Sequence, residues 1–303
     1  MFKSEDSKFY LKTGFKFLGV SIINSLIVYF LFWTVIELNK TFFLSQGYSG
    51  TEEFKLAYFD FVFKFIIDKI SWILGFSVFV FFIGIYTASL LIRPFKSISS
   101  HCASLRDDSS IIYGSSKLSD FKVLQSFAEL FFSSLRKSVK EKEAPCVKIP
   151  NEFKQIREFN SNKVFLFNFM LLFSIICFVC TWFYAASANE IHSSTLELAF
   201  KLLPANKTEI FFYLNNSRDV WYNIVVASSV ITTGTYFLLA RHLYTLVSGA
   251  SLGYFLTMRS FLKGNFNARV HLVGYNYVRL YARHFNKYLD HFCRELKIKI
   301  KKE

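Results

Sequence analysis

Cysteine and histidine are the residue types in this chain whose spacing comes closest to a chemical motif. Cys177 and Cys180 have the C-x-x-C spacing of redox proteins, and His284 and His291 lie seven residues apart, on one helical face. Both cysteines fall within a long apolar stretch, where sulfur packs as a soft apolar group. The two histidines are explained by a solvated helix face. Neither pair predicts a redox or metal site.

Catalytic signatures are missing from the sequence. It contains no G-x-x-x-x-G-K-[ST], no H-E-x-x-H and no G-x-S-x-G. We therefore expect no enzyme activity, no catalytic residue, no cofactor and no metal. Polar residues inside the apolar stretches, such as Asn24 and Asn168, are uncharged, whereas ion or proton transport usually needs ionisable groups there.

Four apolar stretches are the elements that would carry any function. The chain has 303 residues, of which 52% are hydrophobic and 39 are Phe. A transmembrane helix needs about 20 apolar residues, and four stretches meet this length: 17–38, 70–92, 164–188 and 220–247. Helices satisfy their own backbone polar groups inside hydrocarbon. The sequence therefore predicts an all-α membrane protein with four transmembrane helices.

The distribution of basic residues predicts the orientation of these helices. Of the 36 Lys and Arg residues, 29 lie in 1–16, in 93–163 or after residue 240, and only seven lie in 39–69 and 189–219. Basic residues near spans are retained in the cytoplasm. We expect a multi-pass protein of a bacterial inner (plasma) membrane with both termini cytoplasmic. Attraction to anionic membrane lipids explains the net charge of +14, so no nucleic-acid partner is predicted.

The order of elements occurs twice, which predicts two tandem repeats. Each repeat has a basic lead-in, a span, an outer loop, a second span and a cytoplasmic amphipathic segment. The predicted parts are the lead-in 1–16, the span pair 17–92 with outer loop 39–69, the segment 93–140, the return linker 141–163, the span pair 164–247 with outer loop 189–219, the segment 248–296 and the basic tail 297–303.

Both amphipathic segments carry apolar residues at alternating spacings of three and four. This spacing predicts helices that pack in a coiled-coil-like bundle. The four predicted stripes are Phe95, Ile98, Cys102 and Leu105; Phe121, Leu124, Ala128, Phe131 and Leu135; Leu252, Phe255, Met258 and Leu262; and Val278, Tyr281, Phe285, Tyr288 and Phe292. Connectors rich in Ser, Gly, Asn and Asp, at 106–119 and 263–276, separate the paired helices.

The second segment resembles the HAMP domain, a parallel helix–connector–helix module of bacterial receptors. Gly264 stands where the family ends its first helix, and Val270 and Leu272 stand where apolar connector residues enter the bundle. Val278 opens the second apolar stripe. Phe285-Asn286, followed by Leu289, is similar to the Phe-Asn run of the family's second helix. The family's acidic pair falls on Asn276 and Tyr277, which is a departure.

The first segment keeps other features of the same family. Pro94 matches the family's Pro at the membrane exit, and Asp120-Phe121, with Leu124 after it, partly preserves the opening of the second helix. Asp108 stands at the connector glycine position, and Glu129 stands in place of Asn. The simpler alternative is that both segments are generic amphipathic hairpins.

The resemblance implies a four-helix bundle made from two copies of the module. The two copies in this chain can form it as an intrachain pseudo-dimer, and the alternative is a homodimer. The expected function is a non-enzymatic signal relay or adaptor that passes helix rearrangement to an unknown cytoplasmic or membrane protein partner. A structural subunit of an envelope complex is the second hypothesis, and a small transporter is the third.

Overall fold

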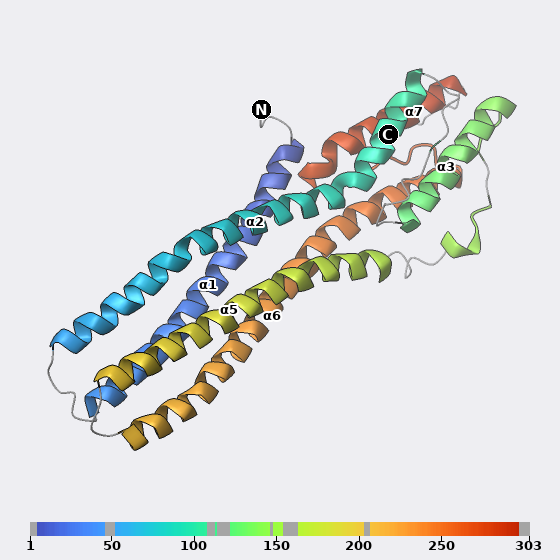
Figure 1. Cartoon of the computed structure of the whole chain (residues 1–303). Helices are drawn as coiled ribbons and strands as arrows, with labels where there is room; N and C mark the ends of the chain where they lie inside the picture. The colour runs from blue at the N-terminus through green and yellow to red at the C-terminus, as the bar shows by residue number, and fades with distance from the viewer. Residues whose placement is uncertain are drawn as a thin grey trace. The chain divides into compact units, whose positions relative to one another are not determined.

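The computed structural model describes residues 5–45, 52–107, 113, 122–145, 148–153, 163–202 and 207–296. Within these ranges the regular structure is helical, and no β-strand occurs. The elements in chain order are α1 (Glu5–Ser45), α2 (Glu52–Asp107), α3 (Lys122–Glu141), η1 (Asn151–Phe153), α5 (Lys163–Leu202), α6 (Lys207–Leu262), η2 (Asn276–Val278) and α7 (Arg279–Glu295), as Figure 1 shows.

Four of these helices are long and apolar enough to cross a membrane. Among the described residues they are Asp6–Ser45, Ile67–Leu105, Met170–Glu197 and Asn215–Leu262. This confirms the predicted all-helical class and the number of apolar helices. Each of the four overlaps one apolar stretch of the sequence, because a run of about 20 apolar residues satisfies its backbone best as a helix.

The helices extend well beyond the apolar stretches. α1 continues to Ser45 and α2 begins at Glu52, so most of the predicted outer loop 39–69 is helical. The same holds for 189–219, where α5 runs to Leu202 and α6 begins at Lys207. Between residues 52 and 69 there is no Gly or Pro, and apolar residues recur at helical spacing. Nothing in that local sequence ends a helix.

The lengths of the helices match between the two halves of the chain. α1 and α5 contain 41 and 40 residues, respectively. α2 and α6 contain 56 residues each. α3 has 20 residues, and α7 has 17. α3 ends at Glu141, and α5 begins at Lys163.

The chain divides into two compact units. Unit 1 comprises Met1–Thr13, Ile85–Met170 and Ala240–Glu303, and unit 2 comprises Gly14–Gly84 and Leu171–Leu239. α2 and α6 contribute residues to both units without a break in the helix. α2 continues through Pro94, whose ring removes one backbone donor from the helix.

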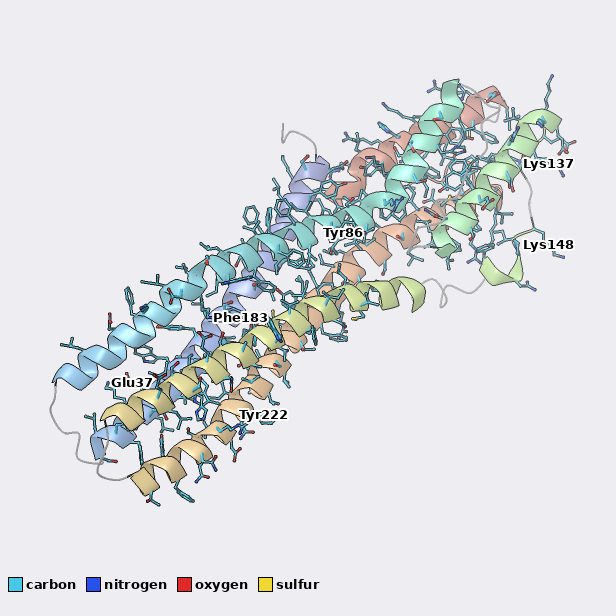
Figure 2. The ribbon with its side chains drawn as sticks, viewed as in Figure 1. Glu37, Tyr86, Lys137, Lys148, Phe183 and Tyr222 are labelled. Carbon is cyan, nitrogen blue, oxygen red and sulfur yellow. The ribbon has the colours of Figure 1, made fainter. Side chains whose placement is uncertain are left out.

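Unit 2 consists of the apolar parts of α1, α2, α5 and α6. Its core contains a cluster in which Val35 and Ile36 of α1 meet Ile191 of α5 and Trp221 of α6. Large apolar side chains also cover its outside: Trp72 is 72% exposed and Phe178 is 73% exposed. Figure 2 shows Tyr222 projecting from α6 in the same way. An outer surface of this kind suits hydrocarbon rather than water.

Unit 1 has the opposite pattern, with aromatic residues inside and charges outside. The side chains of α7 that are buried lie on one face: Tyr281, Ala282, Phe285, Tyr288, Leu289, Phe292 and Cys293. Lys137 of α3 and Lys148 extend outward (Figure 2). α7 is therefore amphipathic, and its apolar face packs against the other helices of the unit.

Candidate functional site

The apolar stripes of unit 1 form its core, which we call the aromatic seam. Most members are buried, whereas Leu105 and Leu252 are half-buried and Phe121 lies outside the described residues. The buried members are Phe95, Ile98, Cys102, Leu124, Ala128, Phe131, Leu135, Phe255, Met258, Leu262, Val278, Tyr281, Phe285, Tyr288 and Phe292. Phe127, Tyr254 and Phe261, which the stripes left out, are also fully buried.

Ring contacts across the aromatic seam join the two halves of the sequence. Phe131 of α3 lies 6.0 Å from Phe261 of α6 and 5.9 Å from Phe285 of α7, measured between ring centroids. Phe95 of α2 lies 5.3 Å from Tyr254 of α6. Such pairs add about 0.5–1.5 kcal/mol each beyond the area that they bury. The helices from residues 93–141 and 248–295 therefore share one core.

A polar contact accompanies these rings. Ser99 Oγ of α2 and His284 Nδ1 of α7 lie 3.0 Å apart at the edge of the seam. His284, which the sequence predicted as an exposed bundle histidine, is exposed, as is His291. Tyr288 lies deeper, and burial is the main reason that the pKa of its hydroxyl is raised above the usual value. The Tyr288 side chain therefore adds no charge to the aromatic seam at neutral pH.

Gly264 ends α6 in a defined backbone turn. Its φ of +93° is a conformation that glycine adopts easily. The Asn265 N–H donates to Ser260 O at 3.1 Å, and the Gly264 N–H donates to Phe261 O at 3.0 Å. This pair of bonds is a Schellman motif, which satisfies the last carbonyls of a helix. The chain then leaves the helix axis and begins the connector at 263–275.

α7 holds this connector through Asn286. Its side-chain Oδ1 accepts the Val270 N–H at 2.9 Å, and its Nδ2 donates to Val270 O at 3.0 Å. Val270 is buried, and Leu272 is half-buried. An unpaired backbone group at this depth would cost free energy. The two hydrogen bonds allow an extended connector residue to enter an apolar core.

One turn further along α7, Asp290 forms the second anchor of the connector. Its Oδ1 accepts from Arg269 Nη2 at 2.6 Å and from Nε at 2.9 Å. Arg269 Nη1 also donates to Phe266 O and Ala268 O at 2.7 and 2.8 Å. This ion pair was not predicted from the sequence. The spacing of Asn286 and Asp290, which puts both side chains on one helical face, could have indicated it.

Two glycines of α6 let the connector approach closely. A Cβ on Gly249 would lie 2.2 Å from the Tyr275 hydroxyl oxygen, and one on Gly253 would lie 2.7 Å from Leu272 Cδ2. The two glycines are four residues apart and therefore share one face of the helix. Tyr277 Oη donates to Leu246 O at 2.8 Å on the same side. The connector thus contacts both α6 and α7.

The first turns of α1 dock on the same part of unit 1. Phe9 stacks on Tyr277 with 4.3 Å between ring centroids and 21° between ring planes. The Tyr281 hydroxyl donates to Asp6 Oδ2. Burial, followed by this hydrogen bond and the Asp6 charge, raises the pKa of Tyr281 above its usual value. The start of α1 is therefore tied to η2 and α7.

The positions chosen from the HAMP resemblance are spread over several elements. Pro94 lies inside α2, and Leu124 is buried on α3. Asp120 lies outside the described residues, as does Phe121. Unit 1 brings the remaining positions together around the connector and α7: Gly264, Val270, Leu272, Val278, Phe285, Asn286 and Leu289.

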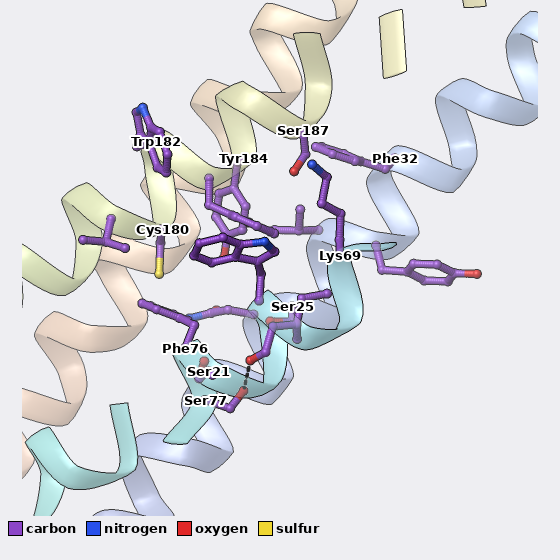
Figure 3. Close-up of a pocket in the computed structure, with 18 of the residues that line it drawn as sticks. Ser21, Ser25, Phe32, Lys69, Phe76, Ser77, Cys180, Trp182, Tyr184 and Ser187 are labelled. Atoms are coloured by element: carbon purple, nitrogen blue, oxygen red, sulfur yellow. Dashed lines mark hydrogen bonds between the residues drawn. The ribbon is translucent and has the colours of Figure 1, made fainter. Parts of the chain in front are cut away.

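Unit 2 contains a cavity of about 500 Å³ that the sequence analysis missed. Its lining combines aromatic residues, such as Trp72, Phe76 and Phe183, with small polar residues. Figure 3 shows Ser21 of α1 and Ser77 of α2 among the lining residues, and Lys69 of α2 extending toward Ser187 of α5. This volume is typical of ligand pockets. The lining suits an apolar group with a few hydrogen-bonding atoms.

Lys69 is the cationic member of the cavity lining, and it is paired. Its Nζ lies 2.8 Å from Glu190 Oε2, and the two side chains are 29% and 49% exposed. Deeper in the unit, the Asn24 amide donates to Thr235 Oγ1 at 2.9 Å. Neither arrangement supplies a nucleophile beside a base. The cavity can hold a group, but these residues have no arrangement for acid–base chemistry.

The described cysteines are free thiols at Cys102, Cys177, Cys180 and Cys293. Burial raises the pKa of the Cys293 thiol, so thiolate chemistry is suppressed there. In the parts of the chain that the structure describes, no three His, Cys, Asp or Glu side chains form a group that could hold a metal ion.

Comparison with known proteins adds no relative to these observations. No protein-family model, curated protein sequence or solved structure matches the chain.

Proposed function

We propose that this protein is a non-enzymatic membrane signal relay or adaptor. In this proposal, rearrangement of its membrane helices reaches a cytoplasmic or membrane protein partner through two HAMP-like segments. The observation that carries the proposal is the continuity of α2 and α6. Each is a single helix of 56 residues that contributes to both compact units. A rotation or shift at one end of a rigid helix is transmitted to the other end.

The matched helix lengths support an origin in two tandem repeats. α1 and α2 have nearly the same lengths as α5 and α6. The shared aromatic seam supports an intrachain pseudo-dimer, because Phe131 of the first half contacts Phe261 and Phe285 of the second. In this proposal, each HAMP-like copy supplies the partner that the other would find in a second chain.

The charge distribution supports the proposed topology. We place both termini and unit 1 in the cytoplasm of a bacterium, with the apolar part of unit 2 in the inner membrane. Basic residues are concentrated in the segments of unit 1, and cytoplasmic segments retain such residues. The same charges attract anionic lipid at the inner surface.

A relay requires two arrangements of the bundle whose populations respond to a signal. The proposed signal is a property of the membrane, because unit 2 presents large apolar side chains outward. A change in bilayer thickness acts on helix tilt. In this proposal, tilt at the apolar end of α2 and α6 alters the packing of the aromatic seam at the other end.

The test measures the bundle while only the bilayer changes. Nitroxide labels at Ser133 of α3 and Lys287 of α7, both exposed positions, report the distance between these helices by pulsed electron resonance. The full chain is placed in nanodiscs of phosphatidylcholine with short or long acyl chains. We expect the ratio of two distance populations to differ between the bilayers.

A helix interruption provides the control for this measurement. Inserting two glycines between Leu239 and Ala240 breaks α6 between the units and should abolish the response to thickness. The same insertion after Glu143, beyond the end of α3, should leave it intact. Identical distance distributions in both bilayers, or a response that survives the break in α6, would rule out the relay.

A further inference from the structure

A groove of about 700 Å³ runs between α5 and α6 within unit 2, with a different lining from that of the cavity described above. Its sides come from positions 181–192 of α5 and 218–233 of α6. Both stretches belong to helices that are apolar enough to cross a membrane. Whatever fills the groove therefore comes from the bilayer side of the molecule.

One end of the groove is polar. Asn189 and His192 of α5 line it together with Arg218 of α6. These positions are close to the ends of the apolar helices, since Met170–Glu197 ends five residues after His192 and Asn215–Leu262 begins three residues before Arg218. Lipid headgroups lie at this depth of a bilayer. The polar end is thus located where a headgroup would be.

The other end of the groove is mainly apolar, although the hydroxyl residues Thr181, Ser229 and Thr233 also line it. Ala185 of α5 and Val225, Val226 and Val230 of α6 line it. These residues lie further from the ends of the apolar helices than the polar group does. An acyl chain fits such a lining, but it gains little there, because the surrounding lipid is equally apolar. Any preference of the groove for one lipid over another must therefore come from its polar end.

The polar end has a cationic group and two buried ring nitrogens that are unpaired among the described residues. Arg218 is exposed and forms no ion pair among the described residues. His192, at 9% exposure, and Trp221, at 3%, also line the groove, and their buried Nδ1 and Nε1 atoms have no hydrogen-bond partner. Buried polar atoms without partners cost free energy. Together with the Arg218 charge, they favour a ligand that carries oxygen acceptors.

We propose that this groove binds one anionic phospholipid of the bilayer. Its phosphate pairs with the Arg218 guanidinium beside His192, and one acyl chain lies along Ala185, Val225 and Val226. The guanidinium fork matches phosphate oxygens in geometry and charge. Because all of these residues belong to unit 2, the site does not depend on the relay. Failure of one proposal leaves the other standing.

The test titrates the full chain with defined lipids and counts bound molecules by native mass spectrometry. Phosphatidylglycerol carries a phosphate and a net negative charge, phosphatidylcholine the same phosphate with a choline ammonium that cancels the charge, and oleate a carboxylate. We expect phosphatidylglycerol to bind about tenfold more tightly than phosphatidylcholine, because both lipids offer a phosphate to Arg218 but the guanidinium repels the choline ammonium. Arg218→Gln should remove this preference. Arg241→Gln, the same charge change elsewhere on α6 and outside the groove lining, should keep it.

A second pair of variants tests the acyl part without changing charge. Ala185→Trp fills the groove and should lower phosphatidylglycerol binding about tenfold or more. Ala186→Trp adds the same ring to the neighbouring exposed position, which does not line the groove, and should leave binding within about twofold. A tenfold loss of affinity corresponds to about 1.4 kcal/mol of binding free energy. This pair remains decisive if Arg218→Gln fails to fold.

Four outcomes would overturn the proposal. Equal binding of phosphatidylglycerol and phosphatidylcholine would show that the groove does not select an anionic headgroup. Equal binding of oleate would indicate a carboxylate site instead of a phospholipid site. Unchanged binding in both Arg218→Gln and Ala185→Trp would exclude this groove. A two-chain species that loses its lipid and is disrupted by Ala185→Trp would make the groove an interface between copies.

Discussion

The two units of this chain are stabilised in different ways, although the same long helices supply both. In unit 1 the connector at 263–275 is held by directional contacts: Asn286 to Val270, Arg269 to Asp290, and Tyr277 to Leu246. In unit 2 the polar contacts join one membrane-length helix to another, as in the hydrogen bonds of Asn24 with Thr235 and of Tyr184 with Thr232 and in the ion pair of Lys69 with Glu190. Apolar residues such as Val35, Ile191 and Trp221 also pack between its helices.

This difference follows from the solvent that each unit suits. Against water, burial of aromatic residues drives association, and polar anchors then select one arrangement. Between helices in lipid, apolar burial gains little, so close packing and small residues decide the contacts. Gly84 illustrates the second case, since a Cβ there would lie 2.9 Å from Gly14 Cα. Changes to core volume should therefore matter most in unit 1, and changes to backbone spacing in unit 2.

The largest effect should come from Phe131→Ala in the aromatic seam. Phe131 is fully buried between Phe261 and Phe285, and removing its ring should cost about 3–5 kcal/mol. Amide hydrogen exchange of α3 and α7 should accelerate at least about a hundredfold. Ser133→Ala, at an exposed position on the same helix, should leave exchange unchanged. Slow exchange in Phe131→Ala would remove the seam as the core of unit 1.

Asn286→Ala should have the next largest effect, limited to the connector. It leaves the Val270 N–H and C=O without their partners, at a cost of about 1–3 kcal/mol. Hydrogen exchange and proteolysis within 265–275 should increase, while α3 remains protected. The adjacent exposed residue supplies a control, Lys287→Ala. If the connector stays protected in Asn286→Ala, packing alone holds it.

A pair of glycine variants tests the role of backbone spacing in unit 2. Gly84→Ala should destabilise by about 1–3 kcal/mol, because its Cβ would meet backbone and the Phe17 ring. Gly75→Ala, where nothing lies within 4 Å of the added Cβ, should stabilise the helix by about 0.5–1 kcal/mol. All four Trp residues lie in unit 2, so thermal unfolding followed by their fluorescence reports this unit. We expect the unfolding temperature to fall in Gly84→Ala and to rise in Gly75→Ala. Equal shifts of the unfolding temperature would contradict the close contact of Gly84 with Gly14 and Phe17.

The smallest effect should come from the hydrogen bond between Asn24 and Thr235. A double-mutant cycle with Asn24→Leu and Thr235→Val should give a coupling energy of about 0.6 kcal/mol, as for other hydrogen bonds between membrane helices. The same unfolding assay measures it. A coupling above about 2 kcal/mol would mean that polar contacts dominate unit 2 as well, and the contrast between the units would disappear.

Several features of the fold could be predicted from the residues in order. The apolar runs predicted four helices, and the alternating spacing of three and four predicted most of the buried residues of α3, α6 and α7, although it left out Phe127, Tyr254 and Phe261. The start of α2 at Glu52 was not predicted, although no residue between 52 and 69 ends a helix. The HAMP resemblance itself stays a prediction.

Local sequence determined the helices, their apolar faces, the end of α6 at Gly264 and the connector, because hydrophobic periodicity and glycine conformation act over a few residues. Only the tertiary structure decided that Phe131 meets Phe261 and Phe285, that Arg269 pairs with Asp290, and that α5 and α6 leave a groove lined by His192 and Arg218. These contacts join residues far apart in the chain. They depend on the packing of whole helices, and helical spacing alone does not encode which faces meet.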